Sequence, residues 1–437
     1  MQPVPPVPPV PSVGAGQSLT LLDAVRRALE QNLTVQQSAL QVAVARSQVA
    51  QAEAGLLPTL GLAGGYTSQT TPGSTALTGQ ITIPSLGING LPFNAITTGQ
   101  VPPPWAFHLT FAYPLYTGNA LQDQVAIAQA TLRGQQSAFT ATAGQTVLTV
   151  RQAYFNYVQS EGQVAAAQRA VDASQENVRV TQAQVRVGTS PEFNLLQAQV
   201  QLATAQRNLT QAKAAAVLAE QQLAAAVNLP ISTPIDATTP MGLPTPPPDV
   251  EDLVKQALSN RAEIAQAQAT IQADQASIDL AASGLRPNVT LSGGPSAATN
   301  DLTHSPVAWS GTIQLTLALF DGGLTHAKVE QARQQLNLAQ VQLEQTQQTV
   351  EEQVRAAYLN LQQAAESLVS AQAGFVAAQE TLRIANVRFA AGVGTQLDVV
   401  TAIQALTNAD AAVVAALFQY NLALAQIDQA VGYKITL

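Results

Sequence analysis

The chain has 437 residues, of which 46% are hydrophobic, 5% aromatic and 11% charged, and its formal net charge is −8. Soluble domains carry about 25% charged residues, so the usual charged surface of a large globular enzyme is missing. With 19 basic against 27 acidic residues and no basic block, the sequence excludes a phosphate-binding surface for nucleic acid. Because there is no cysteine, disulfides, thiol catalysis and cysteine–zinc sites are excluded too.

The first segment, residues 1–17, is rich in proline and predicts an extended tether. No secretory signal is present, which fits a chain whose signal has been removed, although a cytoplasmic protein would look the same. No uninterrupted apolar run approaches the 18 residues of a spanning helix, so an integral helical membrane protein is not expected.

Two regions are almost free of charge. Residues 54–122 contain no Asp, Glu, Lys or Arg, and residues 287–320 contain Asp301 alone. Both show period-two alternation, which predicts strands at about 58–67, 105–116, 287–295 and 309–320. A soluble sandwich alternates in the same way, but its wet face normally carries Lys or Glu. These polar faces carry Thr, Ser, Gln, Asn and His, which favours outer-membrane barrel strands.

Aromatic residues stand near both ends of the predicted strands. Trp105 and Trp309, the two tryptophans of the chain, begin the second strand of each pair, and Tyr113, Tyr116 and Phe320 lie near the other end. Membrane barrels carry aromatic girdles at both lipid interfaces. The tryptophans are therefore predicted at one membrane interface and the other three residues at the opposite one.

The two halves of the sequence are related. Residues 23–64 match residues 252–293 at a constant shift of 229, and from Leu115 onward the shift is 204, pairing Gly188 with Gly392. The missing 25 residues fall between the paired strands, so the first connection, about 71–104, is predicted as a long loop. The predicted organisation is a tether at 1–17, a first repeat at 18–229, a proline-rich linker at 230–248 and a second repeat at 249–437.

Heptads predict two coiled-coil hairpins, at about 150–227 and 354–431. Large residues recur every seven positions and alanine follows three positions later, as in Val354, Leu361, Leu368, Phe375 and Leu382 with Ala357, Ala364, Ala371, Ala378 and Ala385. This pairing of large and small residues allows two helices to approach closely. The helix predicted at about 118–187 is about 105 Å long, a length for crossing a compartment.

Four strands cannot close a barrel, and an open sheet edge cannot persist in lipid. A membrane barrel must therefore be shared between chains. Two chains would give eight strands and three would give twelve, and the strand count alone does not decide between them.

Several motifs are similar to those of one family. They are LTLLDAVRRALEQN near the start, GLLPTL and GLRPNV before a strand, YPLYTG and ALFDGG after one, and RVGTSPEFNLLQAQ and FAAGVGTQLDVVTA at the turns. The chain resembles the TolC-type outer-membrane efflux proteins over about residues 19–432. The resemblance implies a mainly α fold of two helix–strand–strand–long helix–helix repeats. It also implies a homotrimer with a 12-stranded β-barrel in the outer membrane and a 12-helix periplasmic α-barrel.

The resemblance also assigns roles to the hairpin turns. It implies that the turns dock a periplasmic adaptor, or membrane fusion protein, through Gly188, Thr189, Ser190, Pro191, Gly392, Val393, Gly394 and Thr395. From the residues alone, Gly188 and Gly392 suit left-handed helix caps, Thr395 and Asp398 have capping-box spacing, and Ser190 with Pro191 suits an N-cap followed by proline at N1.

The channel entrance is predicted nearby. Asp398 matches a family position at the constricted entrance, where three copies would form an acidic ring and repulsion would raise each carboxylate's pKa. The position three residues on is Thr401, and the matching positions of the first repeat are Asn194 and Gln197, so this entrance is predicted to be weakly acidic.

The predicted function is an outer-membrane exit channel for efflux or type I secretion, joined through the adaptor to an inner-membrane pump or ABC transporter. The alternative is a tether that spans the envelope without conducting. Neither P-loop, dinucleotide nor HExxH motifs occur, so no catalytic, cofactor or metal site is expected. The sequence does not identify the cargo.

Overall fold

The computed structural model describes residues 17–66, 75–83, 88–97, 105–237, 249–299 and 307–432. Its elements in chain order are β1 (Gln17–Leu19), α1 (Leu21–Gln31), α2 (Leu33–Ala54), β2 (Thr59–Tyr66), β3 (Thr75–Ile83), β4 (Ile88–Thr97), β5 (Trp105–Tyr116), α3 (Ala120–Arg186), α4 (Glu192–Ala226), β6 (Ile235–Ala237), α5 (Val250–Asn260), α6 (Ala262–Ala282), a 3₁₀ turn (Ser283–Leu285), β7 (Asn288–Thr299), β8 (Val307–Thr316), α7 (Leu324–Ala390) and α8 (Gln396–Val431).

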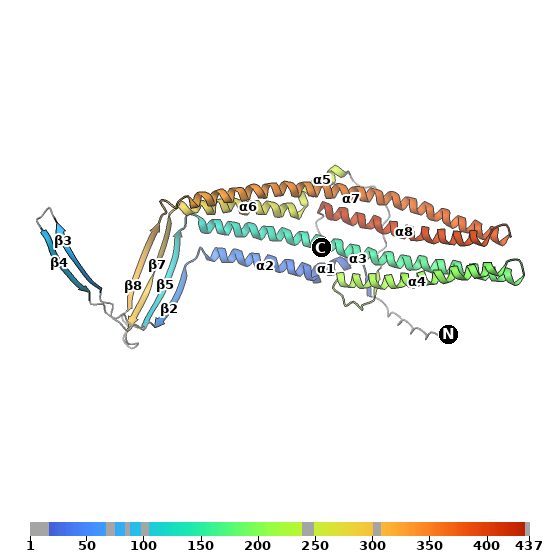
Figure 1. Ribbon diagram of the computed structural model, residues 1–437, viewed down its shortest axis with the longest axis horizontal. Coiled ribbons are helices and arrows are strands. Elements are labelled where there is room, and N and C mark those ends of the chain that lie inside the picture. The colour runs from blue at the N-terminus through green and yellow to red at the C-terminus, as the bar shows by residue number, and fades with distance from the viewer. Residues whose placement is uncertain are drawn as a thin grey trace. The chain divides into compact units, whose positions relative to one another are not determined.

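The chain divides into two compact units. The first comprises Met1–Ala45, Thr131–Ile271 and Leu338–Leu437, and the second Arg46–Ala130 and Gln272–Asn337. The first unit contains two antiparallel pairs, α3 with α4 and α7 with α8, whose turns lie at the same end (Figure 1). The second unit contains the four-stranded sheet. The observed architecture is therefore mainly α, with a β part and two repeats.

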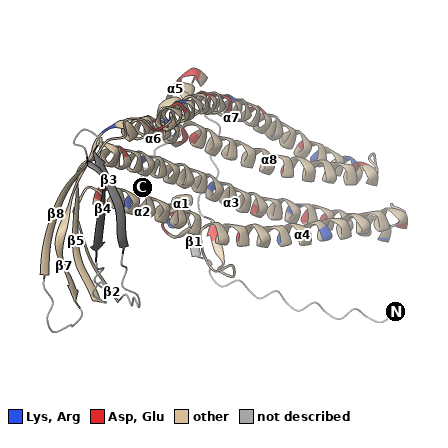
Figure 2. Ribbon diagram, turned by 60° about the vertical axis from the view of Figure 1, so that its left-hand side comes forward, with Lys and Arg blue, Asp and Glu red and all other residues tan. Residues whose placement is uncertain are grey.

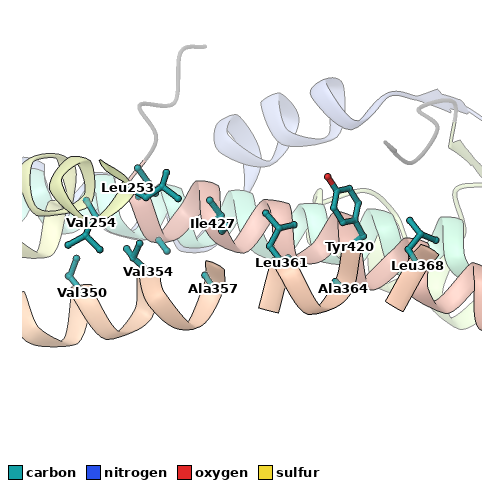
Figure 3. Packing of buried hydrophobic residues seen from close by; sticks show 14 of the residues in the cluster. Leu253, Val254, Val350, Val354, Ala357, Leu361, Ala364, Leu368, Tyr420 and Ile427 are labelled. Carbon is teal, nitrogen blue, oxygen red and sulfur yellow. The ribbon is translucent and has the colours of Figure 1, made fainter. Parts of the chain in front are cut away.

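The heptad positions form the core of the second hairpin. Leu361 and Leu368 of α7 are buried in one cluster with Ala416, Tyr420 and Ala423 of α8 (Figure 3). Alanine opposite a large residue allows the two helices to lie close together, as the heptad pattern predicts. Figure 3 also shows Leu253 and Val254 of α5 at the end of this cluster.

The first helix of each repeat is broken once. Asn32 ends α1 and Arg261 ends α5, both with extended backbone, and these residues are related by the shift of 229. Asn32 Oδ1 accepts the Thr34 N–H at 2.8 Å, and buried Arg261 binds Glu263 at 2.9 Å. The sequence predicted one continuous helix here, and these side-chain contacts stabilise the break instead.

The four predicted strands form one antiparallel sheet in the order β2-β5-β7-β8. Trp105 lies opposite Tyr66, with ring centroids 4.9 Å apart. The last strand was predicted to reach Phe320 but ends at Thr316. Asp321 then accepts the N–H groups of Gly323 and Thr325 and turns the chain into α7, so Phe320 lies outside the strand.

Two pairings were not predicted. The connection at 71–104, expected as a loop, contains the antiparallel pair β3 and β4, because its scattered Pro and Gly residues obscure the alternation. β1 and β6 form a short parallel pair, with Ser18 opposite Asp236. Three-residue strands so far apart in sequence give no periodic signal.

Among the described helices, α8 alone is long and apolar enough by composition to cross a membrane. The apolar side of α8 packs against other helices of the chain, because Ala402, Ala416 and Ala423 are buried. Asp410 also lies in this helix, with a side chain that is 11% exposed and paired with Arg169. These contacts identify α8 as a coiled-coil helix.

Candidate functional site at the hairpin tips

Both hairpins turn on a left-handed glycine. Gly188 has φ +79° and Gly392 has φ +75°, a conformation in which a residue with a Cβ is strained. The next N–H groups close the helix ends, since Thr189 donates to the Gln184 carbonyl at 2.9 Å and Val393 to the Arg388 carbonyl at 3.0 Å. The predicted glycine caps are confirmed.

The second tip has a complete capping box. The Asp398 N–H donates to Thr395 Oγ1 at 3.2 Å, and the Thr395 N–H donates to Asp398 Oδ2 at 2.9 Å. Hydrogen bonds from Thr395 are the main cause that holds the pKa of Asp398 below its ordinary value, and Arg388 adds to the effect. Within one chain, Asp398 therefore remains ionised in neutral solution.

The first tip is capped differently from the prediction. Ser190 was expected as the N-cap and Pro191 as the first helical residue. Instead Pro191 is the N-cap without a side-chain bond, and α4 begins at Glu192. Ser190 Oγ accepts from the side-chain amide of Asn194 at 3.0 Å, so its hydroxyl binds a side chain one turn into the helix.

An open groove of about 760 Å³ lies between the two tips. It brings together residues that the sequence predicted at separate turns: Thr189, Ser190, Pro191, Asn194 and Gln197 of the first hairpin, and Gly392, Gly394 and Thr395 of the second. Phe193, Phe389 and Leu397 contribute apolar surface. Phe193 is 70% exposed, so an aromatic side chain of this groove is accessible to solvent.

The four residues predicted at the entrance do not meet in one place. Asn194 and Gln197 line the groove between the tips, whereas Asp398 and Thr401 line a second groove of about 450 Å³ between α7 and α8. Arg388 lines this second groove too and supplies a positive charge beside Asp398. An acidic ring, which requires several copies of the chain, stays a prediction.

The strand sheet is the second candidate surface. Its four strands carry no charged residue, whereas charges are spread along the helices (Figure 2). Along β8 every residue is exposed, and Trp309 is 78% exposed. Among the strands that the structure describes, β2 pairs only with β5 and β8 only with β7, so this sheet has two open edges. The register places Trp105 and Trp309 toward one end, and Tyr113 and Tyr116 toward the other.

The sequence did not predict the ties between the hairpins or the apolar lining of the groove. Arg169 binds Asp410 and Arg151 binds Asp428, each at 2.6 Å, and both pairs join α3 to α8. Arg–Asp pairs far apart in sequence have no spacing signature. Phe193 gave a weak signal, as an aromatic residue outside the heptad frame. Within the described ranges, no three His, Cys, Asp or Glu residues are placed to hold a metal ion.

Coiled-coil hairpins together with a charge-free sheet whose apolar side chains are exposed are typical of an outer-membrane protein with a long helical part. The chain belongs to the outer membrane efflux protein family, whose model matches residues 24–229 and 253–433. Members of this family are transport channels and not enzymes.

Known proteins agree with this membership. Outer membrane protein TolC of Escherichia coli is 29% identical over 189 residues, covering 43% of this chain and about a third (36%) of TolC. Nodulation protein T of Rhizobium leguminosarum bv. viciae is 25% identical over 415 residues, covering 92% of this chain and 79% of the relative. The crystal structure of CusC has the same fold, with a TM-score of 0.77 and 18% identity, covering 94% of this chain and 92% of CusC.

Proposed function

We propose that this protein is the outer-membrane exit channel of a tripartite efflux or type I secretion system and that it works as a homotrimer. Three copies of the four-stranded sheet give twelve strands, enough for a barrel with an open lumen. The observation that carries the proposal is the charge-free sheet with open edges at β2 and β8. In lipid each edge must pair, and a second copy supplies the matching edge.

The hairpin tips are the second surface on which the proposal rests. The exposed Phe193 and the polar lining of the tip groove provide an apolar anchor and hydrogen-bonding groups for a periplasmic adaptor. Through that adaptor the channel would join an inner-membrane pump or ABC transporter. Passage itself is passive, and the tips gate the entrance.

Two measurements test the proposal. The mass of the detergent-solubilised particle should equal three chains, and reconstituted protein should open pores in planar bilayers. A monomer by mass would contradict the shared barrel. A trimer that never conducts, even after substitutions at the tips, would favour an envelope-spanning tether.

The role of Asp398 at the entrance is tested separately. In the reconstituted channel, Asp398→Asn should lower the preference for cations over anions, because three negative charges are lost at the constriction. Thr401→Val is the control, since it keeps the shape of the same groove without a change of charge. Unchanged ion selectivity in Asp398→Asn would remove this carboxylate from the gate.

A further inference from the structure

Because the two repeats have the same fold, a helix contact within one chain has a counterpart between neighbouring copies of the chain. The shift of 204 maps α3 onto α7 and α4 onto α8. Within the chain, α3 contacts α8, and we call this contact the internal seam. If hairpins alternate around a closed ring of copies, as the proposed trimer requires, α7 of one copy must meet α4 of the next. We call that contact the outer seam.

The internal seam has a clear polarity. Its arginines, Arg151 and Arg169, lie on α3, and their partners Asp428 and Asp410 lie on α8. Between these two ion pairs the helices approach closely at Gly162. A Cβ atom built there would lie 2.9 Å from Cγ1 and 3.8 Å from Cβ of Val414.

The repeat places different charges on the outer seam. Gly162 corresponds to Glu366 on α7, and Val414 corresponds to Thr210 on α4. Arg207 and Lys213 each lie three residues from Thr210, one turn away on either side. Glu366, Arg207 and Lys213 are all exposed, and none of them forms an ion pair with any described residue of its own chain.

The faces of α7 and α4 that would form the outer seam also carry exposed apolar side chains. Phe155 is 6% exposed, in a cluster with Ala425 of α8, whereas its counterpart Leu359 on α7 is 63% exposed. On the other helix, Asn421 is 6% exposed, and its counterpart Val217 on α4 is 51% exposed. The positions that bury the internal seam are thus occupied by exposed apolar residues on the outer faces.

We propose that Glu366 of one copy forms an ion pair with Arg207 or Lys213 of the next copy across the outer seam. This inference rests on the proposed trimer. At this level the charges are reversed relative to the internal seam, since Glu366 of the long helix is negative and Arg207 and Lys213 of the returning helix are positive. The counterpart of Arg151, Arg355, stays positive and pairs within its own chain with Glu251 and Glu351.

The reversal also discriminates against wrong pairings of the similar helices. If α7 met α8 of another copy, Glu366 would lie near Asp410. If α3 met α4 of another copy, Arg169 would lie near Arg207. Both arrangements place like charges together, which is unfavourable.

Engineered cysteines test the geometry, and the natural chain has no cysteine to interfere. Glu366→Cys with Thr210→Cys should form disulfides between chains, because the corresponding internal positions, Gly162 and Val414, place two Cβ atoms 3.8 Å apart, which suits a disulfide. Non-reducing gels should show covalently linked trimers that return to monomers on reduction. The matched control, Gly162→Cys with Val414→Cys, should lose its free thiols while remaining a single chain. A particle with the mass of three chains but no interchain disulfide overturns the inference and leaves the trimer intact; a monomeric particle overturns both.

Charge exchange tests the ion pair itself. Glu366→Lys should weaken the trimer, because it places like charges at each outer seam. The protein concentration below which trimers dissociate in detergent should rise by about tenfold. Adding Arg207→Glu and Lys213→Glu should restore most of the lost trimer stability, because opposite charges then face each other again. A triple variant that dissociates as readily as Glu366→Lys would overturn the ion pair.

Discussion

At the residue scale, three carboxylates gather where α3 meets the short strand β6. Burial raises the pKa of Glu161, and the neighbouring charges of Glu220 and Asp236 raise it further. Tyr157 donates to the Ile235 carbonyl at 2.7 Å, and burial together with the same carboxylates raises its pKa, so it remains a protonated donor. Ionised Glu161 therefore destabilises this part of the fold.

The pH dependence follows from the sign of that shift. A carboxyl group whose pKa is raised in the folded state binds more protons folded than unfolded, so stability falls as the pH rises through the shifted value. We expect Glu161→Gln to raise the thermal midpoint at pH 7 and to have little effect at pH 4. The gain should stay below about 1 kcal/mol, because Glu161 is only partly desolvated and the rest of its side chain contacts screening solvent. A variant less stable than the parent at pH 7 would contradict this.

The capping box at the second tip has the opposite pH dependence. The pKa of Asp398 is lowered in the folded state, so its contribution is complete above the ordinary value and is lost as the pH falls through the folded one. Thr395→Ala removes the cap at all pH values and should cost about 1 kcal/mol. Amides in the first turn of α8 should then exchange about fivefold faster, as measured by hydrogen exchange.

A matched variant exists at the first tip. Ser190→Ala should change exchange in α4 less, because Ser190 binds one side chain and caps no backbone N–H. If Thr395→Ala and Ser190→Ala increased amide exchange equally, the capping box would not be a special source of stability at the second tip.

At the element scale, two glycines of α3 occupy different surroundings. A Cβ at Gly162 would meet Val414 Cγ1 at 2.9 Å, whereas nothing lies within 4 Å of a Cβ at Gly144. Glycine inside a helix costs about 1 kcal/mol relative to alanine. Gly162 is thus explained by the approach of α8, and Gly144 is not explained by packing within the described chain.

This difference predicts opposite effects of one substitution. Gly144→Ala should stabilise the protein by up to about 1 kcal/mol, through helix propensity. Gly162→Ala should gain nothing or destabilise, since the stiff Val414 side chain must move, and adding Val414→Ala should restore the gain. Thermal melting of the four proteins checks this, and stabilisation by Gly162→Ala alone would show that the helices can separate freely.

How far the sequence predicts an element depends on its periodicity. The heptads of α3 and the alternation of β5 extend over many residues. The helix predicted at about 118–187 spans Ala120–Arg186, and the strand predicted at about 105–116 spans Trp105–Tyr116. The break at Arg261 and the pairing of β1 with β6 depend on a few tertiary contacts, which leave no repeating pattern in the sequence. The tip groove required both hairpins to be placed together, so its lining could be named turn by turn but not as one site.

At the scale of the whole molecule, the positions of the two tryptophans indicate how the sheet is placed in a bilayer. Along β7, Trp105 lies opposite Thr299 by its direct pairing and Trp309 lies opposite Pro295, so both tryptophans stand toward the end of the sheet farther from the strand–helix junction at Tyr116. Trp309 is largely exposed, and the ring of Trp105 contacts that of Tyr66 at a tilt of 56°. Tryptophan at the edge of a barrel's apolar band lies at the level of the lipid headgroups.

Fluorescence depth measurements follow from this arrangement. Trp105→Phe and Trp309→Phe each leave a single tryptophan, since the chain has two. In vesicles, both variants should be quenched more by bromine placed near the headgroups than by bromine at the bilayer centre, because both rings lie toward one end of the strands. A third variant places the only tryptophan at the other end of the sheet, by combining Tyr113→Trp with Trp105→Phe and Trp309→Phe. It should also be quenched more by bromine near the headgroups than by bromine at the bilayer centre, because this end is predicted at the opposite interface. Quenching by aqueous iodide without any effect of brominated lipid would place the sheet outside the membrane.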